Sequence, residues 1–245
     1  MSLASLDQRR RAARRRLALL ATGILIGGAG VTAFFVLGSD DAGSGVGQRE
    51  AAPSASAPAA IPSGGSNTPT VLPKPKEVKE GVPVGYPHTL EGAVSAAAHF
   101  TDVNDLFTPD VAERQARVMA EPNYLGMLGT YARMAAQEAR KARGLPENGE
   151  SDTANFYANQ SRAYSIDSAA SDKVTIWILV DSTISVKGVS KNITEVRGAI
   201  MIWAEGDWKM SFDTLDGLPE EQPSPATPGS AQALDEGWRA LAYEK

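Results

Sequence analysis

The feature that most constrains this chain is an uninterrupted apolar run over residues 17–37. At about 1.5 Å of rise per residue, a helix of this length spans the roughly 30 Å hydrocarbon core of a bilayer. A helix that is apolar on every side has no face to expose to water, so we predict that residues 17–37 form a transmembrane helix. Gly23 and Gly27 have the spacing that lets two membrane helices approach closely, and they are candidates for helix association.

The charges beside this run predict its orientation. Positive charge next to a first membrane segment is retained on the cytoplasmic side. We therefore expect residues 1–16 to be a basic cytoplasmic tail and everything after Leu37 to lie outside the cytoplasm, in a single-pass protein of the cell membrane. A cleaved signal peptide is the alternative, but its apolar core is usually about 7–15 residues long. The predicted topogenic residues are Arg9, Arg10, Arg11, Arg14, Arg15 and Arg16.

The composition changes sharply after the apolar run. Of the 43 residues from 38 to 80, 25 are Ala, Gly, Pro or Ser. Such a segment buries too little apolar surface to offset its chain entropy. We therefore predict a disordered linker over residues 38–80, which holds the following domain away from the membrane.

Charge and cysteine content exclude several classes of function. The net charge is −5, and residues 1–16 carry +5, which leaves −10 for residues 38–245. An acidic domain is not expected to bind nucleic acid, because neutralising phosphates requires clustered Lys and Arg. The chain has no cysteine and only two histidines, so thiol catalysis and multi-histidine metal sites are excluded. We predict no cofactor.

Three helices are predicted at the start of a folded domain that we place at residues 81–217. Thr89 is a good N-cap for the first helix, and Thr108 with Pro109 begins the second. The first helix has one face of very small residues, suited to close approach by another backbone: Gly92, Ala93, Ala96 and Ala97. The predicted spans are residues 90–100, 108–120 and 124–143, and Gly144 and Pro146 end the third helix.

The apolar period then changes from about 3.6 to 2, which is typical of antiparallel strands. In the longest of them, Val174, Ile176, Ile178 and Val180 face one way, and Trp177 and Leu179 face the other. In the next, Val196, Ile200 and Ile202 alternate with Arg197, Met201 and Trp203. The predicted strands are residues 163–166, 173–186, 193–204 and 208–215, with turns at 187–190 and 205–207.

Helices followed by such a meander predict an α+β fold, with three helices packed on a curved antiparallel sheet. Residues 218–245 form a Pro-rich break and a last amphipathic segment. Within it, the spacing of Leu234, Trp238 and Leu241 indicates a final helix or a docked tail.

The order of elements over residues 81–215 resembles the nuclear-transport-factor-2-like cone. The stretch from Gly81 to Thr89, followed by Gly92 and Ala93, also resembles a segment of actinobacterial membrane proteins of conjugative elements. The plan of basic tail, anchor, linker and small domain is similar to the assembly-scaffold subunit of type IV secretion systems. The resemblance implies an extracytoplasmic interaction or assembly module that is not an enzyme. Its implied partners are the lipid bilayer, envelope proteins of a conjugation or secretion apparatus, and further copies of itself.

The alternative is a surface-tethered domain that binds a small ligand or acts as an isomerase, because this cone hosts enzymes as well as scaffolds. Enzymes of that fold place an Asp or His base opposite a Tyr or an acid that polarises a carbonyl. The sequence has no nucleophile elbow, phosphate-binding glycine loop or metal-ligand spacing, so we assign no catalytic residue. The candidate cavity residues under this alternative are Tyr86, His88, His99, Asp102 and Tyr131.

Overall fold

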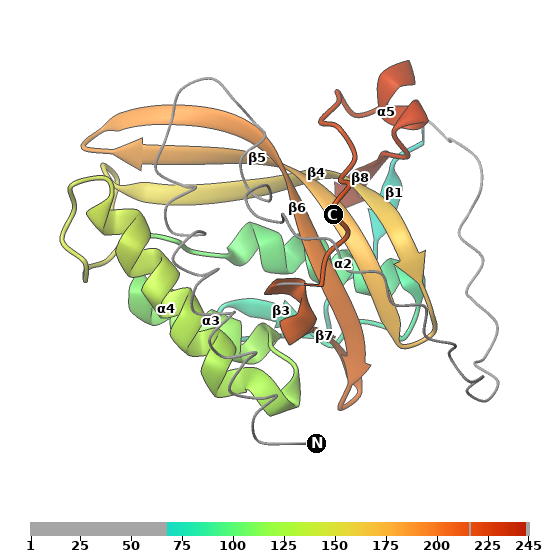
Figure 1. Cartoon of the computed structure of the whole chain (residues 1–245), viewed down its shortest axis with the longest axis horizontal. Coiled ribbons are helices and arrows are strands. Elements are labelled where there is room, and N and C mark those ends of the chain that lie inside the picture. The colour runs from blue at the N-terminus through green and yellow to red at the C-terminus, as the bar shows by residue number, and fades with distance from the viewer. Residues whose placement is uncertain (1–67, 216, 244–245) are drawn as a thin grey trace, which may run out of the picture.

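The structure, a computed structural model, describes residues 68–215 and 217–243 (Figure 1). They form a mixed α+β fold with a curled, mostly antiparallel sheet and a few helices. In this part of the chain, no helix has the length and apolar character needed to cross a bilayer. The predicted transmembrane helix, its six arginines, Gly23 and Gly27 lie outside the described residues.

The main sheet has the strand order β1-β8-β4-β5-β6-β7, and every neighbouring pair is antiparallel except β1 and β8. Three long strands form its centre, and short strands lie at both ends. A separate hairpin joins β2 to β3. The strands are β1 (Thr70–Leu72), β2 (Glu77–Lys79), β3 (Val82–Val84), β4 (Phe156–Ala169), β5 (Lys173–Val186), β6 (Val189–Ala204), β7 (Asp207–Met210) and β8 (Arg239–Tyr243).

Three hairpins close through two-residue turns of the same kind. Glu80-Gly81, Lys187-Gly188 and Glu205-Gly206 each have positive φ at both residues, between 50° and 79°. This pattern defines a type I′ turn, whose twist matches that of the flanking strands, and glycine is favoured at its second position. Turns therefore lie within both predicted loops, 187–190 and 205–207, but each is shorter than predicted, because Val189, Ser190 and Asp207 belong to strands.

Helix α2 (Leu90–Val103) lies directly against the inner face of the sheet. Its N-cap is Thr89, whose hydroxyl accepts a hydrogen bond from the Gly92 N–H at 3.1 Å. A Cβ atom at Gly92 would lie only 2.0 Å from the carbonyl oxygen of Pro87, so only glycine fits there. The predicted close approach of another backbone to this small-residue face is confirmed.

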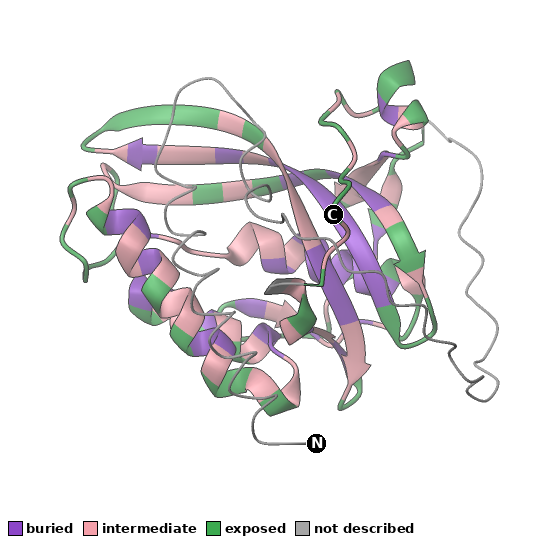
Figure 2. Cartoon of the chain, viewed as in Figure 1, coloured by how far each residue is buried: buried purple, intermediate pink, exposed green. Residues whose placement is uncertain are grey.

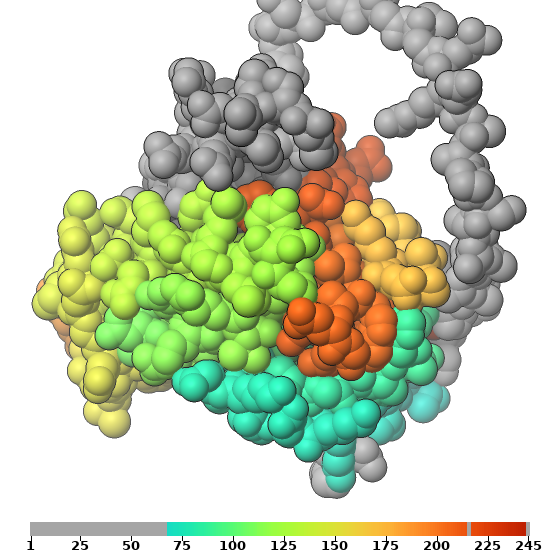
Figure 3. Space-filling model, turned by 90° about the horizontal axis from the view of Figure 1, so that it is seen from below, coloured from blue at the N-terminus to red at the C-terminus, as the bar shows by residue number. Residues whose placement is uncertain are grey.

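The other two long helices pack mainly on each other rather than flat on the sheet. They are α3 (Pro109–Met119) and α4 (Leu125–Lys141), joined by the 3-10 turn η1 (Pro122–Tyr124). Figure 3 shows this helical pair beside the β2–β3 hairpin and the β6–β7 turn. Arg114 on α3 pairs with Glu80 at 3.4 Å, and Lys209 on β7 donates to the Val118 carbonyl at 3.1 Å. Packing on the sheet was predicted for three helices. It is confirmed for α2 and wrong for α3 and α4, which contact mainly each other.

Two apolar clusters cover the two faces of the sheet, as the alternation in β5 predicted. The inner cluster contains Val174, Ile176, Ile178 and Val180, packed against α2. The outer cluster contains Trp177 and Leu179, packed against the segment that carries Trp238. Figure 2 shows the burial concentrated where β5 and β6 cross the middle of the molecule. The predicted assignment of these side chains to opposite faces is confirmed.

The sheet extends further than the predicted domain in both directions. Residues 70–72 pair with β8, and Leu72 is fully buried, so the expected linker over residues 38–80 is wrong for its last part. After the Pro-rich break, the chain forms the short helix α5 (Ala231–Asp235) and then β8. The C-terminal segment is therefore docked mainly as a strand: Trp238 is buried in the outer cluster, and the residues after it pair with β4.

Three strand lengths differ from the prediction. Strand β4 covers 156–169 instead of 163–166, and β6 begins at Val189 instead of residue 193. The added residues are mostly polar, so apolar alternation did not register them. Strand β7 ends at Met210 instead of residue 215, because residues 212–215 form the 3-10 turn η2 (Phe212–Leu215). The Glu121 carboxylate accepts from the Phe212 N–H at 2.9 Å and stabilises this change of direction.

Candidate functional site

The structure brings together three of the five candidate residues: Tyr86, His99 and Asp102. Tyr86 precedes α2, and His99 and Asp102 lie on its last turns. The ring centroids of Tyr86 and His99 are 5.6 Å apart. Tyr243 on β8 joins this group, with its ring 5.0 Å from that of His99 and its hydroxyl donating to Asp102. We call these four residues the inner tyrosine cluster.

Both oxygens of Asp102 accept hydrogen bonds. Its Oδ1 accepts from the backbone N–H and the hydroxyl of Ser161, at 2.6 Å and 2.8 Å, and its Oδ2 accepts from Tyr243. Burial and the hydrogen bond to Asp102 raise the pKa of Tyr243, so this hydroxyl stays protonated and remains a donor. The carboxylate thus ties α2 to β4 and to β8.

Tyr86 has a buried hydroxyl with no hydrogen-bond partner among the described residues. Burial, and then the charges of Asp207 and Asp102, raise the pKa of Tyr86. His99 beside it donates from Nδ1 to the Ser95 carbonyl at 2.8 Å. An unpaired buried hydroxyl commonly costs about 1–3 kcal/mol of stability. The Tyr86 hydroxyl is the one buried polar group of this cluster without a hydrogen bond to offset that cost.

His88 lies elsewhere, at the start of α2. Its ring stacks on Trp203 with centroids 4.1 Å apart, and its Nε2 lies 2.9 Å from the Ser171 carbonyl and 2.8 Å from Asp172 Oδ1. Both partners are acceptors, so Nε2 carries the proton and fastens α2 to the β4–β5 turn. A pocket of about 140 Å³ opens here, lined by His88, Thr89, Leu90, Ala170, Ser171, Val174 and Trp208.

This pocket is smaller than most ligand sites, which usually have volumes of about 300–1,000 Å³. Among the residues that line it, His88 is the single ionisable side chain. Tyr131, the fifth candidate, lies on α4 with its ring 6.2 Å from that of Phe212, away from both places. The five candidates therefore do not share one cavity. The described residues also contain no group of three side chains that could hold a metal ion.

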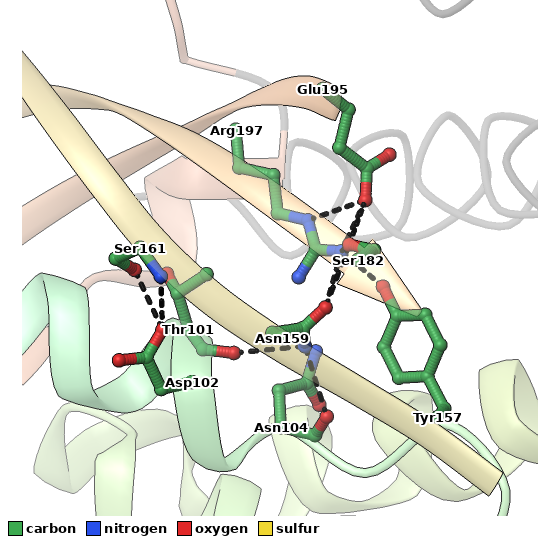
Figure 4. Close-up of polar contacts among 9 residues, drawn as sticks. All are labelled: Thr101, Asp102, Asn104, Tyr157, Asn159, Ser161, Ser182, Glu195 and Arg197. Atoms are coloured by element: carbon green, nitrogen blue, oxygen red, sulfur yellow. Dashed lines mark hydrogen bonds and ion pairs between the residues drawn. The ribbon is translucent and has the colours of Figure 1, made fainter. Parts of the chain in front are cut away.

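A second polar group lies on the inner face of the long strands, centred on Arg197 (Figure 4). The Arg197 guanidinium donates to Glu195, Tyr157, Asn159 and Ser182. Asn159 in turn donates to the carbonyls of Thr101 and Asn104, at 3.0 Å and 3.3 Å. These are carbonyls at the end of α2, which lack partners within the helix. We call Tyr157, Asn159, Ser182, Glu195 and Arg197 the arginine network.

Sequence reasoning missed Tyr243 and most of the arginine network. One signal was present: alternation placed Arg197 on the same face as Met201, which is buried against α2. A charged residue on a core face needs partners, so the position was suspect from the sequence alone. The residues of β4 that contact Arg197 depend on the register of β4 in the sheet. The first half of β4 is mostly polar and has no apolar period from which that register could be predicted.

The fold and these polar groups define a small α+β domain. In it, the Asp102 carboxylate and the arginine network around Arg197 link α2 to the strands of the sheet. A family model matches residues 48–233, and the chain belongs to that family, described as Domain of unknown function (DUF8175). Neither a curated protein nor a solved structure matches the chain.

Proposed function

We propose that this protein is a membrane-anchored module that works by protein contact outside the cytoplasm, as a structural component of a conjugation or secretion apparatus. The observation that carries the proposal is that both oxygens of Asp102, the candidate carboxylate base of the cone interpretation, accept hydrogen bonds from the domain itself. A base must reach a substrate proton, and the oxygens of this carboxylate are already hydrogen-bonded to Ser161 and Tyr243. The sequence plan of basic tail, apolar run and linker supports the location.

The orientation is tested by a reporter that is active only outside the cytoplasm, fused after Lys245. The fusion to the native chain should be active, and replacing the six arginines from Arg9 to Arg16 with glutamate should reduce its activity strongly. An inactive native fusion, together with an active cytoplasmic reporter at the same position, would contradict the proposed topology.

The second candidate, a small-ligand-binding or isomerase-like domain, is favoured by one observation, the unpaired Tyr86 hydroxyl beside His99. Tyr86→Phe separates the two candidates, because it removes only that hydroxyl. A contact module should keep its assembly and its transfer or export function, with equal or greater stability, since an unpaired buried group is removed. A cavity enzyme should lose its activity while folding and assembling normally.

The matched control is Tyr164→Phe. The Tyr164 hydroxyl lies 3.2 Å from Thr70 Oγ1, so this variant should lose a little stability and no function. Assembly is read from cross-linked complexes in membranes of cells that make the full-length chain. A folded, assembled and inactive Tyr86→Phe protein would overturn the proposal in favour of the second candidate.

A further inference from the structure

Strand β6 has an open edge over half its length. On one side it pairs with β5 continuously from Val189 to Ile202. On the other side it pairs with β7 only from Met201 to Ala204. Between these, Ile200 is satisfied by Ser211 and Thr214 of the segment after β7. No pairing strand of the described chain covers the edge from residue 189 to residue 197.

The backbone groups that point out of this edge follow from the register. The two-residue turn Lys187-Gly188 makes Val186 and Val189 a hydrogen-bonded pair, after which odd residues of β6 bond to β5 and even residues point away. The contacts of Ile200 with Ser211 and Thr214 agree with this alternation. The outward donors and acceptors are therefore those of Ser190, Asn192, Thr194 and Val196.

An edge of this length invites another strand unless something blocks it. Charged side chains are a common block, and β6 has Lys191 exposed near the tip and Glu195 and Arg197 on the inner face. The order of these charges along β6, however, complements that of a second, antiparallel copy of β6. In an antiparallel pair of two β6 strands centred on Ile193, Lys191 lies opposite Glu195 of the second copy, and Ile193 lies opposite its own equivalent.

Neighbouring registers lose this match. Centring the pair on Thr194 places Lys191 opposite Arg197, and centring it on Lys191 or on Glu195 places like charges face to face. Opposite charges on directly facing residues stabilise a strand pair, and like charges destabilise it. Glu195 is suited to this role, because it contacts Arg197 and Ser182 through Oε1, which leaves Oε2 for a lysine.

We propose that two copies of this chain associate through their β6 edges, antiparallel and centred on Ile193, so that the two sheets become one. The pair is related by a two-fold axis, as in most homodimers, and uses the same four residues from each copy for backbone hydrogen bonding. This dimer does not depend on the proposed role in a conjugation or secretion apparatus. It is inferred from the open edge of β6, its register with β5 and the charges of Lys191, Glu195 and Arg197.

Cysteine cross-linking tests the register directly, because the chain contains no cysteine of its own. Even residues make the hydrogen bonds across the proposed contact, so Ile193 and its equivalent form a non-hydrogen-bonded pair. The Cα atoms of such a pair are about 4.5 Å apart, within the range that a disulfide bridges. Ile193→Cys in the full-length chain should therefore give a covalent dimer under mild oxidation. Ser190→Cys is the matched control, because Ser190 is exposed on the same edge but faces Val196 of the second copy, roughly 20 Å from its own equivalent.

Two further variants keep the test decisive if Ile193→Cys perturbs the strand. Thr194→Pro removes an outward N–H without touching the β5 ladder, and proline is tolerated at such edge positions. It should reduce dimerisation at least tenfold, measured as molecular mass by light scattering in detergent, whereas Thr194→Ala should leave the dimer intact. Lys191→Glu should weaken the dimer similarly, because it faces Glu195.

Efficient cross-linking of Ile193→Cys with little for Ser190→Cys, lost on adding Thr194→Pro, would support the proposal. Equal cross-linking of both cysteines would indicate random collision and overturn the register. A monomeric mass for the unmodified chain, or a cross-link from Ile193→Cys to a different protein or to the chain's own residues 1–67, would overturn the second copy as the occupant of the edge.

Discussion

Along β5, the half from Val174 to Val180 and the half from Ser182 to Val186 are held by different interactions. The first half is buried on both faces, by α2 on one side and by the segment carrying Trp238 on the other. The second half is held on its inner face by the arginine network and has exposed neighbours in β6. The same strand thus passes from apolar packing to hydrogen bonding within a few residues.

The difference teaches how one long sheet can serve two purposes. Apolar packing is insensitive to direction and seals the centre of the domain against water. Hydrogen bonds are directional, so the arginine network fixes where the distal strands lie without covering them. The half of the sheet around Ser182 to Val186 is therefore held in place by hydrogen bonds, while the neighbouring edge of β6 stays open. The proposed contact between two β6 edges needs both properties.

The largest effect is expected from the apolar half. Ile178 is fully buried in the inner cluster, so Ile178→Ala should lower the free energy of unfolding by about 2–5 kcal/mol. The measurement is a urea titration of the full-length chain in detergent, followed by tryptophan fluorescence, since all four tryptophans lie in the described part. Val78→Ala, at a site 64% exposed, is the control and should change stability by less than about 0.5 kcal/mol. Equal effects at both sites would refute the comparison.

A smaller effect is expected from the polar half. Arg197→Met removes the donors that Glu195, Tyr157 and Asn159 share and should cost about 1.5–3 kcal/mol, the range for hydrogen bonds to charged groups. Arg197→Lys keeps the charge but loses the planar fork, so it should recover only part of that loss. The surface control is Arg162→Ala, whose pair with Asp181 at 3.5 Å is worth at most about 1 kcal/mol. An Arg197→Met chain as stable as the parent would remove the network from the account.

The smallest effect concerns the helical pair. Hydrogen bonds from Arg133 and Arg117 hold the pKa of Glu113 below its usual value, so this carboxylate is ionised more readily in the folded chain. Its contribution is present above the unfolded pKa of about 4.3 and is lost as the pH falls through the lower, folded pKa. Urea titrations from pH 6 to pH 3 should therefore show a shallower acid loss for Glu113→Gln. High salt should reduce the difference, and a steeper loss for Glu113→Gln would contradict the sign.

The apolar half of the fold could be predicted from the sequence, and the polar half could not. The alternation of Val174, Ile176 and Ile178 against Trp177 fixed the faces of β5, because burial repeats with the period of the strand. Thr89 and Gly92 likewise fixed the start of α2. The extent of β4 was missed because Asn159 and Ser161 are placed by specific hydrogen bonds, which have no period.

The candidate site was predicted in part for the same reason. Tyr86, His99 and Asp102 do come together, since two of them lie on one turn-spaced face of α2 and the third directly precedes it. Tyr243 was missed because it reaches Asp102 only through the pairing of β8 with β4 and β1. Contacts between residues this far apart in the chain follow from sheet order, which local patterns do not determine.

The most direct test of the central claim, that the inner polar residues hold the fold while the protein works by contact, is the Asp102→Asn variant, measured for folding, assembly and function in the same cells. Asparagine keeps one carbonyl oxygen for Ser161 but cannot act as a base. We predict a modest loss of stability, with assembly and transfer or export near the parent level at temperatures where the variant is folded. A folded and assembled Asp102→Asn chain whose activity falls by about 10²–10⁴, as expected on removing a general base, would contradict the account.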